Sequence, residues 1–334
     1  MQALTQLDRI SLIIVTWNGD DVLKACLDSI VRVYGALPET LIVDNANQAS
    51  TAKLVSGYAN ARLIALPENR GFAGGNTAAL PFCTKDYLIL LNNDTVLTGD
   101  AISPLIDFLE SHPAAAAAQG KLLLGQGPRL DGCGAFLSPL GILSFRGAFV
   151  PDAPEFNHPE RVFAISGAFF AIRRNALVAC GGFFYDHFQS YYEEIDLYHR
   201  LARAGFECWY VPTPPVWHIH SATSNKFKRE TILRQYYRNI WFSFLTCFDA
   251  FARIHYCTLL FMLSLGQSIA GLLRGNATAL RAHLSVGRQI FAERKLIRET
   301  RQKLRALRKR SDREILSFAV RHQPLSYYWS LLRK

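Results

Sequence analysis

The stretch Tyr87–Asp94, with the sequence YLILLNND, joins an unbroken apolar run to two amides and a carboxylate. Because the run shows no polar alternation, we expect a strand that is buried on both faces of a sheet. Strands of this kind belong to parallel α/β sheets, whose ligands bind at the carboxyl ends of the strands. Asp94 stands at that end, and we interpret it as the anchor of a metal–diphosphate group.

The composition is apolar for a purely soluble protein, with 50% hydrophobic and 19% charged residues in a chain of 334. This length is enough for one large domain or for a domain with an appendage. The cysteines are scattered without metal-ligand spacing, which is typical of reduced core thiols in a cytosolic protein. The first residues, Met1–Arg9, hold no long apolar stretch, so we expect no cleaved signal peptide.

Three further apolar runs precede this strand, at Ser11–Thr16, Leu41–Val43 and Arg62–Leu66. Between the first two runs, apolar residues recur at helical spacing after Asp20, a residue that can cap a helix. The pattern is therefore β-α-β-α-β with short turns. We predict an α/β fold with a mostly parallel, Rossmann-like sheet and right-handed crossovers.

Each of these four strands ends in a polar cluster, and in a parallel sheet the four clusters share one edge. The clusters are Trp17-Asn18, Asp44-Asn45, Asn69-Arg70 and Asn93-Asp94. They predict a site of nucleotide size, in which Trp17 flanks a base and Asp44 accepts a hydrogen bond from a base or a ribose. The glycines at positions 71, 74 and 75 indicate either close approach to a ligand at a helix start or an ordinary tight turn.

The middle of the chain continues the alternation of helices and strands. We predict a helix over Asp100–Ser111, a strand over Ala114–Leu124 and a buried strand over Ala164–Ile172. Residues 125–160 contain many glycines and prolines, and we interpret them as a long functional loop.

An acidic cluster of Glu193, Glu194 and Asp196 opens a predicted helix that ends at Gly205. In a helix Glu193 and Glu194 point roughly 100° apart, whereas Asp196 shares a face with Glu193. Acidic residues in a first turn are explained either by the helix dipole alone or by a catalytic site. The tyrosines and glycines directly upstream favour a site.

A further candidate is His218, which follows a proline-rich turn. Such a histidine is either an ordinary surface residue or, beside Asp94, the second ligand of a metal ion. A carboxylate, an imidazole and diphosphate oxygens form a mixed nitrogen and oxygen set. We therefore expect Mn²⁺ rather than Mg²⁺ as the cofactor.

The order of these motifs resembles inverting family 2 glycosyltransferases with the GT-A fold, especially the bacterial rhamnosyltransferase-like branch. The resemblance covers about residues 10–245 and is carried by the whole set of motifs. These motifs are Ser11–Gly19, Val43–Asn45, Asn69–Asn76, Leu91–Asp94, Ser166–Ala168, Tyr192–Leu197 and His218. The resemblance implies a nucleotide-diphospho-sugar donor, a divalent metal and direct displacement at the anomeric carbon.

The resemblance also implies a role for each matching residue. Asp94 matches the last acid of the family's D-x-D element, and His218 matches its later metal ligand. Glu194 matches the carboxylate proposed as general base, with Glu193 and Asp196 as supporting acids. The residues that match the donor-binding motifs are Thr16, Trp17, Asn18, Asp44, Asn69, Arg70, Gly71, Asn76 and Asn93.

Two positions depart from the family pattern. Asn92 stands where D-x-D has its first acid, so a metal would have one carboxylate fewer. Glu194 stands where this branch usually has Asp, which moves the carboxylate by one methylene. A glutamate near its reference pKa of roughly 4.3 is ionised at neutral pH and can take the proton of an acceptor hydroxyl.

The C-terminal part, residues 239–334, differs in composition from the predicted catalytic domain at residues 1–238. Ile254–Leu273 is a run of twenty residues without Asp, Glu, Lys or Arg, which is long enough to span a membrane. Its polar residues leave three interpretations open: an interfacial or shallowly embedded helix pair, a true span, or a packed helix of a soluble protein. Residues 239–252 are rich in aromatic side chains, which suits a lipid headgroup boundary.

The net charge of +10 is concentrated from Arg274 to Glu314, a segment that contains 13 Arg or Lys and 4 Asp or Glu. This charge suits either a solvated helix or contact with anionic lipid. No nucleic-acid-binding motif accompanies it, so we expect no nucleic-acid partner. Ile290, Ile297 and Leu304 repeat every seven residues and predict a narrow apolar stripe that packs on the body or on a second subunit, as in a homo-oligomer.

Together these features predict a membrane-associated inverting glycosyltransferase at the cytoplasmic face of a bacterial inner membrane, peripheral or monotopic. On the resemblance, the expected donor is dTDP-rhamnose, and the expected acceptor is a lipid-linked or polymeric cell-surface glycan precursor. One alternative uses UDP-galactose, UDP-galactofuranose or another hexose donor in the same site. The other is a non-catalytic, sugar-nucleotide-binding scaffold subunit, in which Asn92 and Glu194 mark a decayed site.

Overall fold

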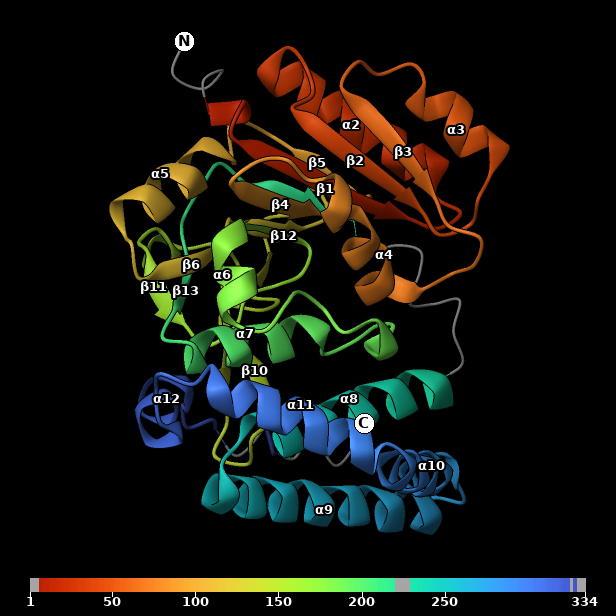
Figure 1. The fold of residues 1–334 in the computed structure, drawn as a ribbon, viewed down its shortest axis with the longest axis vertical. Coiled ribbons are helices and arrows are strands. Elements are labelled where there is room, and N and C mark those ends of the chain that lie inside the picture. Colours follow the sequence, from red (N-terminus) through yellow and green to blue (C-terminus); the bar gives the residue numbers. More distant parts are fainter. Residues whose placement is uncertain (1–5, 220–228, 325–326, 329–334) are drawn as a thin grey trace.

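The N-terminal strands pair in parallel because both of their faces are apolar and both are covered by helices (Figure 1). The computed structural model describes residues 6–219, 229–324 and 327–328. β1 (Ile10–Thr16) lies between β2 (Glu39–Asp44) and β4 (Tyr87–Leu91), and β3 (Ala61–Ala65) pairs with β2. These four strands are parallel, which confirms the prediction from the sequence.

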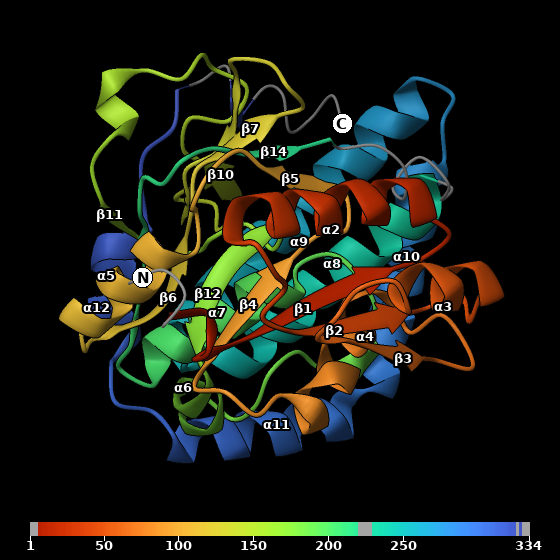
Figure 2. The same cartoon turned by 90° about the horizontal axis from the view of Figure 1, so that it is seen from above.

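Further strands extend this sheet into a mixed one of eight strands, in the order β11-β13-β6-β12-β4-β1-β2-β3. The added strands are β6 (Ala115–Gln119), β11 (Glu160–Val162), β12 (Phe169–Arg173) and β13 (Glu207–Tyr210). β12 is antiparallel to both of its neighbours, β4 and β6. Figure 2 shows β3, β2, β1, β4 and β12 side by side.

Helices cover the two faces of the sheet, and successive residues of each inner strand point to opposite cores. In β1, Ile13 packs into one core, whereas Leu12 and Ile14 pack into the other. The covering helices are α2 (Asp20–Tyr34), α3 (Ala49–Val55) and α5 (Ser103–Ser111) on one face, and α4 (Gly71–Ala79), α6 (Arg174–Ala179) and α7 (Glu193–Arg203) on the other.

A second sheet of four strands stands beside the main one, in the order β5-β14-β7-β8. Its strands are β5 (Thr95–Leu97), β7 (Leu122–Leu124), β8 (Leu130–Gly132) and β14 (Val216–His218). β14 is antiparallel to β5 and parallel to β7, so His218 lies opposite Thr95 on one side and Leu124 on the other. The pairing with β5 therefore places His218 beside Thr95, the residue that follows Asp94.

Two predicted strands are wrong in extent. The strand expected over 114–124 is divided into β6 and β7 at Gly120, where a Cβ atom would lie 2.4 Å from Phe169 Cε1. The strand expected over 164–172 begins only at Phe169. The residues before it form a turn, in which Ser166 N donates to Gln119 Oε1 at 2.8 Å.

The interpretation of residues 125–160 as one long loop is also wrong. The segment contains β8, β9 (Ala135–Leu137), β10 (Leu143–Phe145) and a 3-10 turn at Pro154–Phe156. β9 and β10 form an antiparallel pair, and β8 joins the second sheet. Strands of three residues are too short to show a period of two in the sequence.

Helices from the C-terminal part form the base of the molecule, at the end away from α2 and α3 (Figure 1). They are α8 (Arg229–Cys247), α9 (Ala250–Leu273), α10 (Thr278–Ala292), α11 (Arg294–Ala306) and α12 (Asp312–Ala319). The domain boundary predicted between residues 238 and 239 falls within α8. Phe242 and Phe244 of α8 share one hydrophobic core with Leu197 of α7, so the base is packed onto the sheet domain.

The predicted apolar stripe is interrupted at Glu293, between α10 and α11. Ile297 and Leu304 are buried against the body of the same chain, and Ile290 is partly buried there. In α9 the buried residues recur every fourth position along one face. By length and composition alone, α9 is apolar enough to cross a membrane.

Candidate active site

The pairing of β14 with β5 brings His218 to the carboxylate that follows β4. His218 Nε2 lies 3.3 Å from Asp94 Oδ1, and Ile219 N donates to the carbonyl oxygen of Asp94 at 2.9 Å. Asn92 Nδ2 also lies 3.3 Å from His218 Nε2. The two side chains predicted as metal ligands are therefore neighbours, although they are far apart in the sequence.

Asp131 is the third member of this cluster, and no motif of the sequence indicated it. Asp131 Oδ2 lies 2.7 Å from His218 Nδ1, because β8 pairs with β7, the neighbour of β14. Burial by itself lowers the pKa of His218, but the hydrogen bonds to Asp131 and Asp94 raise that pKa to about 9. The two carboxylates therefore favour the protonated imidazole when no cation is bound, and a metal ion at Nε2 would replace the proton there.

The donor atoms of this cluster fit a divalent cation, although within the described residues no group of three or more His, Cys, Asp or Glu side chains is placed to hold one. Adjacent ligands of one ion lie about 3 Å apart when the metal bonds are about 2.1 Å long. The 3.3 Å between Asp94 Oδ1 and His218 Nε2 is close to this spacing. Asp131 holds the other ring nitrogen, as carboxylates commonly do behind metal-binding histidines. Two protein ligands leave positions for water and a diphosphate.

The predicted donor-binding residues stand at the carboxyl edge of the parallel strands, and several contact one another. Asn93 Nδ2 donates to Thr16 Oγ1 at 3.0 Å, which ties the end of β4 to the end of β1. Arg70 N donates to Asn45 Oδ1 at 3.2 Å, which ties the third polar cluster to the second. Asn76 instead is buried in α4 and donates to a carbonyl of its own helix.

Asp44 holds the loop that follows β2. It is buried, and its carboxylate accepts the backbone N–H groups of Ala46 and Gln48 at 2.8 and 2.7 Å. Gln48 Nε2 donates to Asn18 Oδ1 at 2.5 Å, which joins this loop to the one after β1. Asn18 is exposed and Trp17 is half-buried. The nucleoside contacts of these residues stay predictions, and the structure adds a role for Asp44 in shaping the edge.

Gly71 makes a close approach, but to the backbone of its own chain. Its φ is +69°, and a Cβ atom there would lie 2.4 Å from the carbonyl oxygen of Gln189. Asn69 Oδ1 accepts the N–H of Gly71 at 2.8 Å, and the guanidinium of Arg70 pairs with Asp186. The glycine-rich segment therefore docks the start of α4 on the segment that leads into the acidic helix.

The segment before α7 has a strained backbone. Gln189, Tyr191 and Tyr192 have φ values of 58°, 72° and 73°, which side-chain-bearing residues rarely adopt. Asn239 of α8 fixes the segment, because its Nδ2 donates to the carbonyls of residues 188, 190 and 191 at 2.9, 3.2 and 2.6 Å. Strain of this kind is concentrated at functional sites, where the surrounding structure enforces it.

Glu193 and Glu194 begin α7 in different surroundings. Glu193 is buried, whereas Glu194 is half-buried, with its Cδ 3.7 Å from where a Cβ on Gly167 would stand. The turn at Gly167 connects to β4, since the next carbonyl, that of Ala168, accepts the N–H of Asn92 at 2.9 Å. Among the described residues, neither Glu193 Oε2 nor Glu194 Oε2 has a hydrogen-bond partner.

The two glutamates do not titrate as ordinary carboxylic acids. Burial raises the pKa of Glu193 well above its usual range, and the neighbouring charge of Glu194 adds to this. Burial also raises the pKa of Glu194 to about 7. The expectation of a reference pKa at position 194 is therefore wrong. A carboxyl group that titrates near neutral pH is suited to exchange protons with a reacting hydroxyl.

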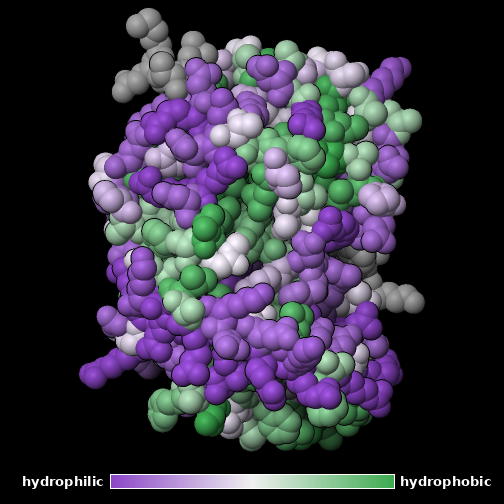
Figure 3. All heavy atoms as spheres, viewed as in Figure 1, coloured by the Kyte–Doolittle hydropathy of each residue, from purple (hydrophilic) through white to green (hydrophobic). Residues whose placement is uncertain are grey.

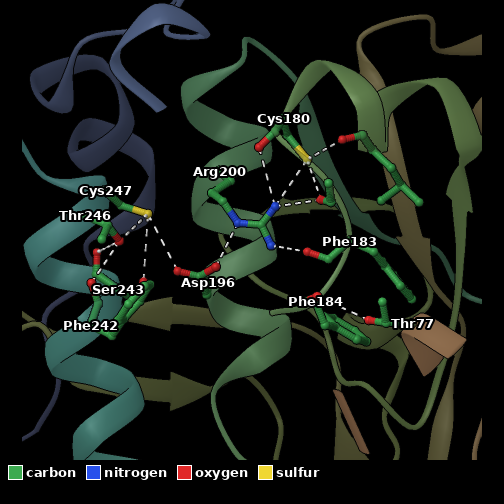
Figure 4. Close-up of polar contacts among 12 residues, drawn as sticks. Thr77, Cys180, Phe183, Phe184, Asp196, Arg200, Phe242, Ser243, Thr246 and Cys247 are labelled. Atoms are coloured by element: carbon green, nitrogen blue, oxygen red, sulfur yellow. Dashed lines mark hydrogen bonds and ion pairs between the residues drawn. The ribbon is translucent and has the colours of Figure 1, made fainter. Parts of the chain in front are cut away.

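Asp196 lies in a buried network on the inner side of α7 (Figure 4). Its Oδ2 accepts the Nε of Arg200 at 2.8 Å, and its Oδ1 lies 3.7 Å from Cys247 Sγ of α8. Arg200 also donates to the carbonyls of Gly182 and Phe183, at 2.7 and 2.5 Å. These contacts make Asp196 a positioning residue that ties α7 to α8 and to the segment before it.

We expect Asp196→Ala to destabilise the fold by about 3–5 kcal/mol, because it leaves the Arg200 guanidinium buried without its carboxylate. Chemical unfolding monitored by circular dichroism measures this change. The matched control is Lys24→Ala, which removes an exposed ion pair with Asp28 at the same i,i+4 spacing. The control should change the free energy of unfolding by about 0.5 kcal/mol or less. Equal effects of the two substitutions would contradict the assignment.

Glu194 opens into a cavity of about 770 Å³ between the sheet domain and the C-terminal helices. Tyr192 and Tyr236 line the cavity near this acid, and Gln267 and Arg274 of the helical base line it as well. Aromatic rings beside a few polar groups are typical of sites that bind polar organic molecules. The carboxyl edge of the sheet and this cavity are thus two separate places where substrates can be held around α7.

The mixed sheet, with its acid after β4 and its acidic helix α7, defines the GT-A glycosyltransferase fold. The family model described as "Glycosyltransferase like family 2" matches residues 8–238. The chain therefore belongs to this family of glycosyltransferases.

Curated relatives match the chain over part of their length. A poly-beta-1,6-N-acetyl-D-glucosamine synthase of Staphylococcus aureus (strain MSSA476) is 21% identical over 215 residues, which are 64% of this chain and 50% of that protein. Protein CgeD of Bacillus subtilis (strain 168) is 27% identical over 124 residues, which are 34% of this chain and 29% of that protein. The chain spans about half or less of the length of these relatives.

Solved structures share the fold at low sequence identity. GalNAc-T7 with UDP, GalNAc and Mn²⁺ aligns with a TM-score of 0.57 and 16% identity, over 78% of this chain and 50% of that one. The mannosyltransferase PcManGT of Pyrobaculum calidifontis, with GDP-Man and Mn²⁺, aligns with a TM-score of 0.52 and 16% identity, over 90% and 84%. TarS of S. aureus aligns with a TM-score of 0.54 and 14% identity, over 92% and 54%.

Proposed function

We propose that this chain is an inverting glycosyltransferase that moves a sugar from a nucleotide-diphospho-sugar to a cell-surface glycan precursor. The convergence of Asp94 and His218 beside the turn that contacts Glu194 carries this proposal. The donor binds at the carboxyl edge of the sheet, and the acceptor binds in the cavity into which Glu194 opens. The acid therefore lies between the two substrates.

The reaction is a single displacement. The acceptor hydroxyl gives its proton to Glu194 while its oxygen forms a bond to the anomeric carbon, and the bond from that carbon to the diphosphate oxygen breaks. Attack from the face opposite the leaving group inverts the configuration. Asp94 and His218 would hold a divalent cation, whose charge would offset that of the departing diphosphate. We propose Mn²⁺, which suits the mixed donor set and is present in the GalNAc-T7 and PcManGT structures.

The donor sugar that we propose first is rhamnose carried by dTDP, from the resemblance to the rhamnosyltransferase-like branch. The second candidate is a UDP-hexose or UDP-galactofuranose in the same site. Structural neighbours that hold UDP or GDP-Man are consistent with a nucleoside diphosphate in general. For the acceptor class, the names of the relatives favour a cell-surface polysaccharide, since one is a poly-beta-1,6-N-acetyl-D-glucosamine synthase.

We expect kcat/KM to rise with pH through about 7 and then to level off, because Glu194 accepts a proton only in its ionised form. One pH unit below this pKa, the rate should be about tenfold lower than on the plateau. Glu193, Tyr192, Tyr198 and Tyr236 face the same carboxylate, and burial raises the pKa of each. Melting temperatures over the same pH range control for unfolding, and a flat rate profile would contradict the assignment.

The base of the molecule supports attachment to a membrane surface, which we propose to be the cytoplasmic face of a bacterial inner membrane. Figure 3 shows an apolar base beneath a hydrophilic band. The exposed apolar residues of α9 are Phe251, Ile254, Phe261, Met262, Leu265, Ile269, Leu272 and Leu273. α9 lies along the base, packed on α8 and α10, and the basic α11 lies above it (Figure 1). This arrangement favours a helix in the plane of the interface over a span.

A thermal-shift panel of nucleotide sugars, with and without Mn²⁺, tests the proposed function, followed by assay of donor hydrolysis without acceptor. We expect Mn²⁺-dependent stabilisation by one nucleotide sugar and slow release of its nucleoside diphosphate. Stabilisation by a UDP-hexose but not by dTDP-rhamnose would show that the donor is the second candidate and not the first. Binding without hydrolysis or transfer would favour the scaffold alternative, and no binding at all would overturn the proposal.

A further inference from the structure

A second cavity lies in the helical base, as an apolar groove of about 750 Å³ between α8, α9 and α10. Its walls include Trp241 of α8, Phe261 and Leu265 of α9, and Leu284 and Phe291 of α10. Four of these five side chains are exposed to the surroundings, Trp241 being half-buried. A groove of this size is within the range of about 300–1,000 Å³ that is typical of sites for small organic ligands.

The groove is adjacent to the acceptor cavity. His283 of α10 lines both spaces, so the two cavities are neighbours at this residue. The acceptor cavity, into which Glu194 opens, is polar toward the C-terminal end of α9, where Gln267 and Arg274 line it. Glu194, then a positive charge with polar groups, and then the apolar groove beyond His283 therefore follow one another toward the base. This is the order of chemistry along a glycolipid: sugar, phosphate and hydrocarbon chain.

Gly287 lies on the wall of the groove with open space beside it. It lines the groove in α10, and a Cβ atom built on it would meet no heavy atom within 4 Å. Glycine in a helix interior is unfavourable by roughly 0.5–1 kcal/mol relative to alanine. A residue with a higher helix propensity would therefore fit here without a clash. The glycine does not stabilise the helix, and its lack of a side chain leaves space on the groove wall.

We propose that the groove between α9 and α10 binds the hydrocarbon chain of a lipid-linked acceptor, so that its sugar reaches Glu194 in the adjacent cavity, past His283. This inference rests on the proposed glycosyltransferase function and adds the site and the chemical class of the acceptor's anchor. The groove holds the part of the chain nearest the phosphate, and the rest stays in the bilayer that the exposed face of α9 contacts. The occupant is the acceptor's own chain and not a bulk phospholipid, because the groove adjoins the cavity that Glu194 lines.

A photolabelling experiment on the full chain tests this assignment. The probe is a polyprenyl phosphate with a diazirine in its chain, presented in detergent micelles and mapped by peptide mass spectrometry after irradiation. We expect labels on the groove wall of α9, at the buried Ser264 and Ser268, and on the facing part of α10, near Leu284. Unlabelled polyprenyl phosphate should compete, and phosphatidylglycerol should not. Labels spread evenly over the outer face of α9, or equal competition by phosphatidylglycerol, would overturn the proposal.

Gly287→Phe provides the matching variant, because it fills the groove from a position with open space. We expect groove labelling to fall about tenfold or more, since the apolar contact area of the chain is lost. The control is Ala292→Phe, which adds the same ring at an exposed end of α10 outside both cavities and should keep normal labelling. Both variants should keep the wild-type melting temperature and the wild-type donor stabilisation.

The readouts separate this inference from the proposed function. If donor stabilisation by nucleotide sugars is present but Gly287→Phe labels like the wild type, the groove assignment is wrong and the glycosyltransferase proposal stands. If no nucleotide sugar binds while groove labelling behaves as expected, the chain-binding site stands and the proposed transfer reaction falls. Transfer to a short, water-soluble acceptor analogue should be unaffected by Gly287→Phe.

Discussion

Glu194→Gln is expected to abolish sugar transfer while donor binding stays at the wild-type level. The amide keeps the size of the side chain but cannot take a proton, and loss of a positioned general base lowers rates by about 10²- to 10⁴-fold. Glu194 is half-buried and lines the acceptor cavity, so the change alters no contact at the carboxyl edge of the sheet. Transfer assays under saturating donor measure kcat, and thermal shift with the same donor measures binding.

Two companion variants make this result specific. Glu194→Asp should keep part of the activity, because it retains a carboxylate and the related branch usually carries Asp at this place. Glu193→Gln should reduce transfer less than Glu194→Gln, since Glu193 is buried beside the site and does not line the cavity. Near-normal turnover in Glu194→Gln would end the assignment of the base. So would a larger loss in Glu193→Gln.

The parallel half of the fold could be predicted because its physical cause is local. Strands covered on both faces must be apolar throughout, and β1, β2 and β4 show this as unbroken runs. The division between β6 and β7 was missed, although Gln119 and Lys121 flank Gly120 and interrupt the apolar run from Ala114 to Leu124. The cause lies in the ring of Phe169, which packs against Gly120 from a distant strand.

The candidate site, like the fold, could be predicted from the sequence only in part. Asp94 and His218 were found because each follows a recognisable strand or turn, whereas Asp131 stands in a segment of very short strands. Its place behind His218 depends on the β8–β7 pairing, which no local pattern reveals. The raised pKa of Glu194 comes from its burial in the folded chain, which sequence spacing does not show. One signal was available: Asp196 and Arg200 are spaced i,i+4, which favours an ion pair within the helix.

Asp94→Ala is expected to remove metal-dependent donor binding. Asp94 supplies the carboxylate oxygen 3.3 Å from His218 Nε2, and its loss leaves an imidazole alone to hold a cation at the edge of the sheet. The affinity for Mn²⁺ should fall by more than the roughly 10- to 100-fold typical of losing a residue behind a ligand. Isothermal titration of the nucleoside diphosphate, with and without Mn²⁺, measures the coupling between metal and nucleotide.

Asp131→Asn provides a milder variant for comparison with Asp94→Ala. Asp131 contacts Nδ1 of His218, whereas the proposed cation would lie between Asp94 and the other ring nitrogen of His218. We expect the affinity for Mn²⁺ in this variant to fall by about 10- to 100-fold, which is less than in Asp94→Ala. Metal-independent binding of the nucleotide should be equal in both variants and the wild type, since the contacts between Thr16 and Asn93 are untouched. If Asp94→Ala titrates with Mn²⁺ as the wild type does, the cation binds elsewhere, and the meeting of β14 with β5 serves the fold alone.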